Sequence, residues 1–300
     1  MDTDIQIARG LIGAASIRGG PTQEQMNLIQ SLLHGYFGSD ADAEKLSALS
    51  PEDLAAIVDP DDRHRVADLL VVLEFCRHPY DEAQADLVEK YVGALGVDEP
   101  MLILARDAIQ GEVEKVAADW SRLNAPPSGE RAIAEQDRDY GAKLRALENC
   151  PPLSLGRTYF QYYQQFDSPF PGEDGGPHPS VASHDFDHVI TGYDTDPPGE
   201  LALQAMLLAS NGFQDHFSSL VASLLLYESA SLPFLTIIPK EAVLDRDGAM
   251  DLLANGFLRG QMTTVDCRSL DHMAIVNRPL AEIRRDCGIE PLSQPAHWDR

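Results

Sequence analysis

Two histidines four residues apart are the feature of this sequence that most directly suggests chemistry. His184 and His188 share one face of any helix that contains them, so both imidazoles can reach one ion. Asp185 borders the same face, and Glu200 follows after a turn. Two imidazoles and two carboxylates suit zinc, and also iron(II) or manganese(II). The sequence therefore predicts a four-ligand metal site at His184, Asp185, His188 and Glu200.

The two acidic members of this set are also the candidates for catalysis. In an HExxH zinc helix, the acidic residue beside the first histidine acts as a base. Asp185 has a shorter side chain, so direct ligation, orientation of a ligand and proton transfer all stay open for it. Asp187 and Asp194 are expected to be solvated carboxylates that only shape the local field. No cysteine lies nearby in sequence, which argues against the cysteine-containing ligand sets of structural zinc sites.

The predicted metal-site residues would lie on two helices, a short one and a longer one, joined by a tight turn. Residues 183–190 suit a helix that Gly192 ends, because glycine favours the position after a helix. Pro197 or Pro198 then begins a longer helix that carries Glu200 in its first turn. An antiparallel pair of helices would return Glu200 towards the end of the first helix. A long loop at 168–180, rich in proline and glycine, precedes the pair and is a candidate lid.

The rest of the chain also has helical patterning, so we predict an all-α fold. Thr22, Ser50 and Asp81 are suited to cap helix N-termini in the first half. Residues 18–28 and 77–87 form a weak repeat, in which Gln25 is equivalent to Gln84.

A break in the helical pattern divides the chain into two predicted domains. Proline, glycine and serine at 124–130 indicate a linker, which we place at 124–133. This gives an N-terminal helical bundle at 1–123 and a C-terminal metal-binding domain at 134–300.

Composition and charge narrow the function classes. Hydrophobic residues make up 44% and charged residues 24% of the 300 residues, which is typical of globular proteins. The net charge of −25 repels phosphate backbones, so we expect no nucleic-acid partner. No signal peptide or bilayer-spanning stretch is evident, and the four separate cysteines suit a reducing compartment. A cytoplasmic protein is expected.

The predicted metal site has an apolar and aromatic sequence environment. Most of these residues suit an ordinary helical core, and some of them could line an apolar ligand pocket. The aromatic residues are concentrated at 159–166. Arg157 and Arg259 are candidate cations for an acidic group of a substrate, or surface partners of this acidic chain.

The metal motif and its surroundings resemble the coenzyme Q biosynthesis protein 4 family. His184-Asp185-x-x-His188, eleven residues and then Glu200 is similar to the family's HDxxH-x11-E signature. Further similar segments are Leu155-Gly-Arg157, Gly199 to Ala205, Leu258-Arg259-Gly260 and Pro279 to Arg284. The resemblance covers about 134–292. Residues 1–123 resemble the tellurite-resistance protein B-like helical domain, but 13–20 lack the acidic residues of its metal-binding turn.

The resemblance implies a zinc-type protein of ubiquinone or prenylquinone biosynthesis. It implies removal of the carboxyl group at C1 of a prenylated 4-hydroxybenzoate, with hydroxylation there, as by a metal-dependent decarboxylase or oxidoreductase (a lyase). His184, Asp185, His188 and Glu200 carry over as metal ligands, and Arg157 and Arg259 as substrate contacts. The implied partners are a prenylated aromatic lipid or other isoprenoid, a quinone-biosynthesis complex, the inner membrane in peripheral contact, and a second copy in a homodimer.

Two positions depart from the family pattern and bear on the identity of the substrate. Asp187 stands where the family commonly has an aromatic residue, and Cys267 stands where it usually has tryptophan.

Two alternatives accompany the enzyme hypothesis. One is a non-catalytic lipid-binding scaffold whose ion only holds two helices together. The other is an HD-type phosphohydrolase, which the compact spacing fits poorly.

Overall fold

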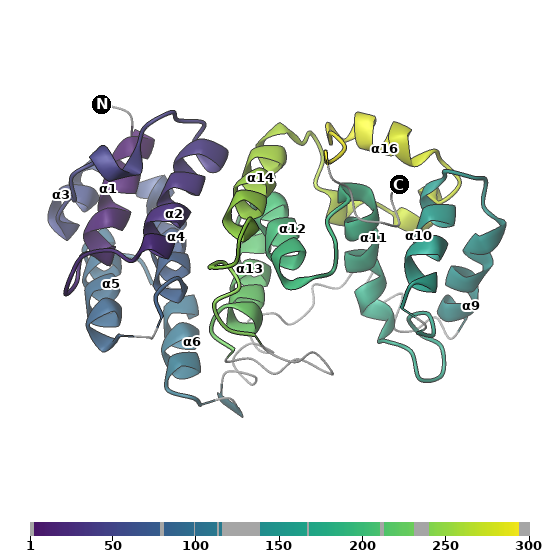
Figure 1. Ribbon diagram of the computed structural model, residues 1–300, viewed down its shortest axis with the longest axis horizontal. Helices are drawn as coiled ribbons and strands as arrows, with labels where there is room; N and C mark the ends of the chain where they lie inside the picture. Colours follow the sequence, from purple (N-terminus) through teal and green to yellow (C-terminus); the bar gives the residue numbers. More distant parts are fainter. Residues whose placement is uncertain are drawn as a thin grey trace. The chain divides into compact units, whose positions relative to one another are not determined.

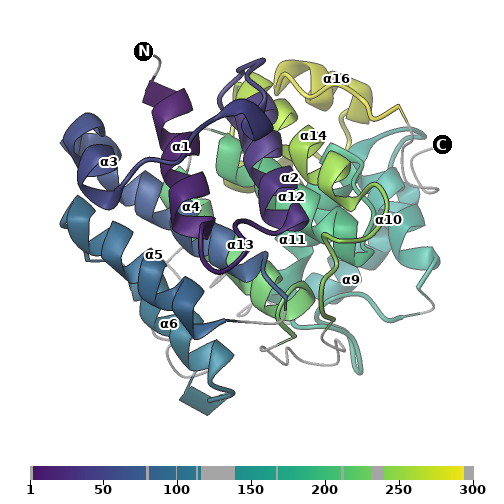
Figure 2. The same ribbon diagram turned by 60° about the vertical axis from the view of Figure 1, so that its left-hand side comes forward.

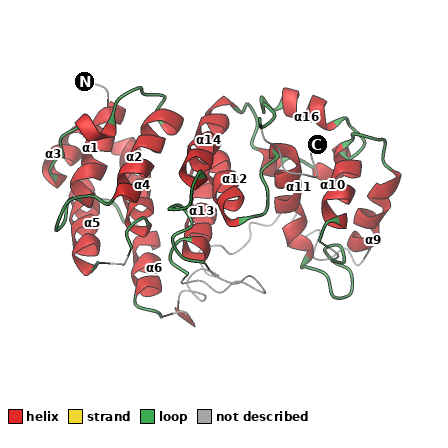
Figure 3. Ribbon diagram, in the orientation of Figure 1, coloured by secondary structure: helices red, strands yellow, loops and turns green. Residues whose placement is uncertain are grey.

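Helices are the regular secondary structure of the described part of the chain. The computed structural model describes residues 3–78, 81–98, 100–112, 114–115, 139–166, 168–210, 213–230 and 240–293. Within these ranges there is no strand, and two isolated bridges, Ser154 with Pro279 and Ser229 with Glu241, are the only β-type pairings (Figure 3). The predicted all-α class is confirmed.

The chain folds into two compact units, and neither unit is a continuous stretch of sequence. Unit 1 comprises 1–124 and 197–261, and unit 2 comprises 125–196 and 262–300. This differs from the domains predicted from the sequence, 1–123 and 134–300, because a break in composition indicates only the position of a candidate linker. It does not show which later helices pack back on earlier ones. The predicted linker at 124–133 lies outside the described residues.

Unit 1 combines helices from both segments of its chain (Figure 1). Its apolar core joins the first segment to the second, since α13 packs on α4 and α6 as well as on α12. The helices are α1 (Thr3–Ala15), α2 (Gln23–Ser31), the π-helix η1 (Leu32–Tyr36), η2 (Ala43–Lys45), α3 (Pro51–Ile57), η3 (Pro60–Asp62), α4 (Arg63–Phe75), α5 (Glu82–Leu95), α6 (Pro100–Ile109), α12 (Pro197–Ala209), α13 (Phe213–Tyr227) and α14 (Ala249–Met262).

The predicted helix starts in this unit are confirmed. The Thr22 side chain accepts a hydrogen bond from the amide of Gln25, whose own side chain returns one to the Thr22 amide. Ser50 and Asp81 cap α3 and α5 in the same way through their side-chain oxygens. Each cap satisfies an amide that the first helical turn leaves without a partner.

The two equivalent glutamines of the weak repeat meet in the core of unit 1. Gln25 Nε2 donates to Gln84 Oε1 over 3.2 Å, and both side chains are fully buried. The Arg77 guanidinium donates to both side-chain oxygens. These bonds hold the N-terminal ends of α2 and α5 together.

Helices α12 and α14 approach each other unusually closely, and they lie side by side in both ribbon views (Figures 1 and 2). A Cβ added at Gly256 would lie 2.3 Å from the Ala202 carbonyl oxygen, and one at Gly260 would lie 2.3 Å from that of Met206. Both distances are far below van der Waals contact, so only glycine allows this packing.

Unit 2 is smaller and is organised around α11. This helix packs on α10, α16 and η6, and α10 also contacts η4 and α9. Its elements are α9 (Tyr140–Arg145), η4 (Ala146–Asn149), α10 (Leu155–Gln164), η5 (Pro179–Val181), α11 (Ala182–Thr191), η6 (Cys267–Ser269), α15 (His272–Ile275) and α16 (Leu280–Asp286). The amide of Leu155 donates to the Arg278 carbonyl oxygen over 3.0 Å, which ties the start of α10 to the chain before α16.

None of the helices in the described ranges combines the length and the apolar character that crossing a membrane requires.

Candidate metal centre

The first pair of candidate ligands lies on α11, which closely matches the predicted helix. The helix continues from the single turn η5 and ends at Gly192, whose φ of 87° is left-handed. Glycine adopts this conformation without the cost that a Cβ would add. The loop predicted at 168–180 has turns and bends without a helix over 168–178, and its last two residues belong to η5.

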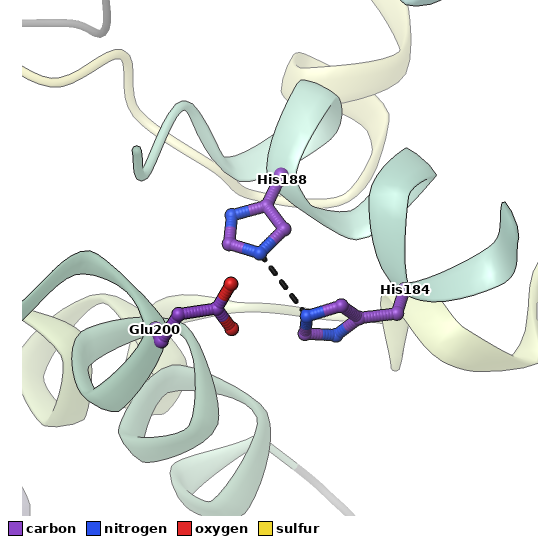
Figure 4. A group of neighbouring side chains, drawn as sticks. All are labelled: His184, His188 and Glu200. Atoms are coloured by element: carbon purple, nitrogen blue, oxygen red, sulfur yellow. Dashed lines mark hydrogen bonds between the residues drawn. The ribbon is translucent and has the colours of Figure 1, made fainter. Parts of the chain in front are cut away.

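His184 and His188 present the same ring nitrogen to each other. Their Nε2 atoms are 3.1 Å apart, and the ring planes are nearly perpendicular at 84° (Figure 4). Two nitrogens bound at 2.0–2.1 Å to one tetrahedral ion lie about 3.3 Å apart. The observed spacing is therefore close to that of two ligands of one ion.

A backbone carbonyl fixes the orientation of His188. The ring is fully buried, and its Nδ1 atom lies 3.0 Å from the Tyr193 carbonyl oxygen. A carbonyl oxygen can only accept, so Nδ1 carries a proton, and Nε2 of the neutral ring is its acceptor nitrogen. This is the arrangement in which metal-binding histidines are commonly held. The ring nitrogen directed at His184 is the one that can bind an ion.

Glu200 follows after a short connection, in the first turn of α12. Residues 182–209 are a continuous, fully described stretch, and α12 begins at Pro197 as predicted. One ligand atom from each of His184, His188 and Glu200 lies within 4.8 Å of the other two (Figure 4). Two imidazoles and one carboxylate form a donor set found in zinc sites that keep a position open.

Asp185 is not a member of this group of three. Its carboxylate accepts hydrogen bonds from the hydroxyls of Tyr163, on Oδ2, and Tyr162, on Oδ1 at 3.4 Å. Burial and the nearby Asp185 raise the pKa of Tyr163 well above its usual range, so this phenol stays a donor. The Tyr162 ring also stacks 6.5 Å from that of His188. The aromatic cluster of α10 thus contacts both Asp185 and a candidate ligand.

Asp187 is buried, which contradicts the expectation of a solvated carboxylate. Its side chain is inaccessible, and its oxygens lie 3.8 Å from Arg268 Nε and 3.9 Å from His272 Nε2. His272 is also buried, and its Nε2 atom lies 3.0 Å from the Cys267 carbonyl oxygen. Its ring stacks on that of Phe186. Asp187 and Cys267, the two positions that depart from the family pattern, therefore belong to one packed region where α11 meets η6.

The two candidate substrate cations lie in different environments. Arg157 donates from NH1 to the Glu148 carbonyl oxygen, and its guanidinium lies 5.6 Å from the centre of the Phe160 ring. It belongs to the face of α10 opposite to Tyr162 and Tyr163, which contact Asp185. Arg259 is buried within α14 of unit 1. The structure thus brings His184, His188 and Glu200 together and does not bring Arg157 to the histidine pair.

Arg284 is a positioning residue that the sequence reasoning did not single out. Its guanidinium is buried and donates to the carbonyl oxygens of Ile190, over 2.7 Å, and Val189, over 2.9 Å. These carbonyls belong to the last turn of α11, where a positive charge is favourable. The only sequence signal was the match of Pro279 to Arg284 to a family segment, which assigned Arg284 no role.

The described chain is thus an all-helical protein with a preoriented histidine pair and a carboxylate next to it. No protein-family model matches the chain, and no curated protein matches it. Among solved structures, it is similar to a protein from Nostoc punctiforme PCC 73102 that is provisionally described as a ubiquinone biosynthesis protein. The two are 17% identical, the match covers 76% of this chain and 97% of the other, and the TM-score is 0.33.

Proposed function

We propose that this protein binds one divalent metal ion through His184, His188 and Glu200 and acts on C1 of a prenylated 4-hydroxybenzoate in ubiquinone or prenylquinone biosynthesis. The observation that carries the metal proposal is the set of three donors, with Asp185 engaged by two tyrosine hydroxyls. A saturated set of four protein ligands would favour a purely structural ion. Three ligands leave one position of a tetrahedral ion for a substrate or water. The ring substrate is proposed on the resemblance of 134–292 alone.

Each residue of the site has a proposed part in binding. Zinc, or iron(II) or manganese(II), would supply positive charge that favours a carboxylate or phenolate oxygen at the open position. The Tyr193 carbonyl keeps His188 in the tautomer that can bind the ion. Tyr163 and Tyr162 donate hydrogen bonds to the Asp185 carboxylate and orient it beside the histidine pair. Asp185 is the proposed proton acceptor, and Glu200 would complete the ligand set.

The proposed reaction replaces the carboxyl group at C1. In simple decarboxylation, the bond to the carboxyl carbon breaks, CO2 leaves, and the ring carbon takes a proton. Hydroxylation at the same carbon is in addition an oxidation by two electrons, so an assay must supply dioxygen and a two-electron donor. Both outcomes release the carboxyl carbon, which makes CO2 the product to measure.

The test compares metal-loaded variants on a short-chain prenylated 4-hydroxybenzoate labelled in its carboxyl group. Protein stripped of metal is reloaded with zinc, iron(II) or manganese(II) and assayed for labelled CO2. We expect release by the wild type and a loss of at least about a hundredfold in His188→Ala and Glu200→Gln, since ligand loss removes the bound charge. His64→Ala, which changes an exposed histidine in α4, is the matched control and should retain activity.

Two results would overturn parts of the proposal. If a wild type that binds metal and lipid shows no turnover with any metal, the enzyme hypothesis would be wrong and the lipid-binding scaffold would be favoured. If the wild type binds none of the three metals at this site, both the enzyme and the scaffold hypotheses would be wrong. Elemental analysis of the wild type and of His188→Ala measures this directly.

A further inference from the structure

A second group of metal-type donors lies within unit 1, far in sequence from the histidine pair. Glu24 belongs to the first turn of α2, His78 follows α4, and Glu228 follows α13. One ligand atom from each lies within 4.8 Å of the other two. The packing of unit 1 thus brings together three side chains from three separate segments.

Ligand-type atoms of all three side chains face one another at the centre of this group. His78 Nε2 lies 2.7 Å from Glu228 Oε1 and 3.7 Å from Glu24 Oε2. Two ligands at 2.0–2.2 Å from one ion are about 3 Å apart at 90° and about 3.4 Å apart at the tetrahedral angle. The observed distances lie on either side of these values. The amide of Leu244 donates to Glu228 Oε2 over 3.0 Å, which fixes this carboxylate with Oε1 directed at His78 Nε2.

With both carboxylates ionised, the group would hold more buried negative charge than its own imidazole can compensate. Glu24 is 4% exposed, Glu228 is inaccessible, and His78 is 18% exposed. Glu24 Oε1 is buried and makes no hydrogen bond within the part of the chain that the structure describes. Even a protonated His78 balances only one of the two carboxylates, and Asp245 adds to the negative field. Burying an uncompensated carboxylate is costly, so the group requires a proton or a cation.

The pKa of Glu24 reflects this excess of carboxylate charge. Burial, followed by the neighbouring Glu228, raises the pKa of Glu24 to about 10. Glu228 raises the pKa of His78 as well, in the direction expected for an imidazole beside a carboxylate. A divalent ion would offset both carboxylates at once and would bind the neutral imidazole through Nε2.

We propose that Glu24, His78 and Glu228 form a second binding site for a divalent first-row transition metal, independent of the one at His184 and His188. Two carboxylate oxygens and one imidazole nitrogen suit manganese(II), iron(II) and zinc. The ion would join α2, the connection after α4 and the chain after α13, and would thereby tie the two sequence segments of unit 1 together. The site is structural in this role, and its existence does not depend on the proposed reaction.

The decisive measurement is metal stoichiometry in the full-length chain. Protein stripped with a chelator is dialysed against zinc or manganese(II), and bound metal is counted by elemental analysis. We expect two ions per chain in the wild type, one in His78→Ala, one in His188→Ala and none in the double variant. His64→Ala, with its exposed ring, should keep both ions. One ion in both the wild type and His78→Ala, lost in His188→Ala, would overturn the second site.

Variants that keep the shape of the side chains separate a bound ion from a bound proton. Glu24→Gln and Glu228→Gln are near-isosteric, so each should lose one ion and lose the thermal stabilisation that added metal gives the wild type. If a proton alone satisfies the group, Glu24→Gln mimics the protonated acid. It would then leave the metal count and the melting temperature unchanged or raise the latter, and the proposal would be wrong. These variants also decide the question if His78→Ala fails to fold.

Discussion

Single hydrogen bonds determine what the candidate site can do. The bond from His188 Nδ1 to the Tyr193 carbonyl oxygen, over 3.0 Å, selects the tautomer that leaves Nε2 for an ion. The bonds from Tyr163 and Tyr162 draw the Asp185 carboxylate towards α10. His188 and Asp185, two neighbouring residues of suitable type, are therefore oriented by different partners.

The Tyr163 hydroxyl should contribute measurably to stability through Asp185. Tyr163→Phe removes a donor to a carboxylate that is only 9% exposed, so we expect a loss of about 1–3 kcal/mol in the free energy of unfolding. The measurement is urea denaturation. Tyr162→Phe is the matched control, because its bond to Asp185 is 3.4 Å long and should contribute less. Equal losses in the two variants would contradict this ranking.

Glu74 should make the stability of unit 1 depend on pH. Burial raises the pKa of its carboxyl from 4.5 to about 7, against the opposing effect of Arg106. The folded state then holds the proton more tightly than the unfolded state, so this contribution to stability is present below pH 4.5 and is lost as the pH rises through 7.

The isosteric variant tests this assignment. In Glu74→Gln, the fall in unfolding free energy between pH 5 and 8 should be smaller than in the wild type by about 2–3 kcal/mol. Urea denaturation at a series of pH values measures this difference. Glu89→Gln is the control, because Glu89 is half-exposed and pairs with the same Arg106. The same pH dependence in Glu74→Gln and wild type would show that Glu74 is ionised in the folded state.

At the scale of elements, the ends and crossings of helices position the candidate ligands. Helix α11 carries both histidines, and its C-terminal carbonyls are bound by Arg284 from α16. Helix α12 carries Glu200 and is packed closely by α14 through Gly256 and Gly260. The ligands therefore depend on residues distant in sequence.

Loss of the Arg284 guanidinium should loosen α11. Arg284→Gln removes two charge-assisted bonds to the last turn, and we expect a loss of about 2–4 kcal/mol in unfolding free energy together with weaker metal binding. Urea denaturation and metal titration measure the two effects. Arg285→Gln, next to it but 70% exposed, should change neither by more than about 0.5 kcal/mol. Unchanged metal affinity in Arg284→Gln would show that α11 is held in place without it.

The crossing of α12 and α14 should not tolerate a methyl group. Gly256→Ala places a Cβ 2.3 Å from the Ala202 carbonyl oxygen, so the helices must separate, at a cost of about 2–4 kcal/mol. Gly93→Ala is the matched control, because a Cβ at that position in α5 meets no atom within 4 Å. It should stabilise by about 0.5–1 kcal/mol through helix propensity. Thermal unfolding compares the two, and a stable Gly256→Ala would refute the close crossing.

For the whole molecule, the dominant feature is a net charge of −25. Self-repulsion among surface charges opposes compaction and is screened by salt. We expect the urea midpoint of metal-free protein to rise when NaCl is raised from about 20 to about 200 mM, as the screening length shortens from roughly 20 to 7 Å. A midpoint that falls with salt would mean that attractive ion pairs dominate over repulsion.

Much of the local structure was predictable because its causes are local. The helix periodicity, the caps at Thr22, Ser50 and Asp81 and the stop at Gly192 involve neighbours within a few residues. The His184–His188 spacing likewise places two rings on one face wherever a helix forms. The unit boundaries were not predictable in this way, because α12, α13 and α14 join the unit built from the first segment of the chain.

The sequence by itself determined the all-α class, the helix that carries the histidines and the turn that precedes Glu200. Only the tertiary structure decided that Asp185 is bound by tyrosines, that Asp187 is buried beside Arg268 and His272, and that Glu24, His78 and Glu228 meet. The physical reason is that helices and caps depend on contacts within a few residues. Burial, charge compensation and ligand sets depend on segments that meet only when the helices pack.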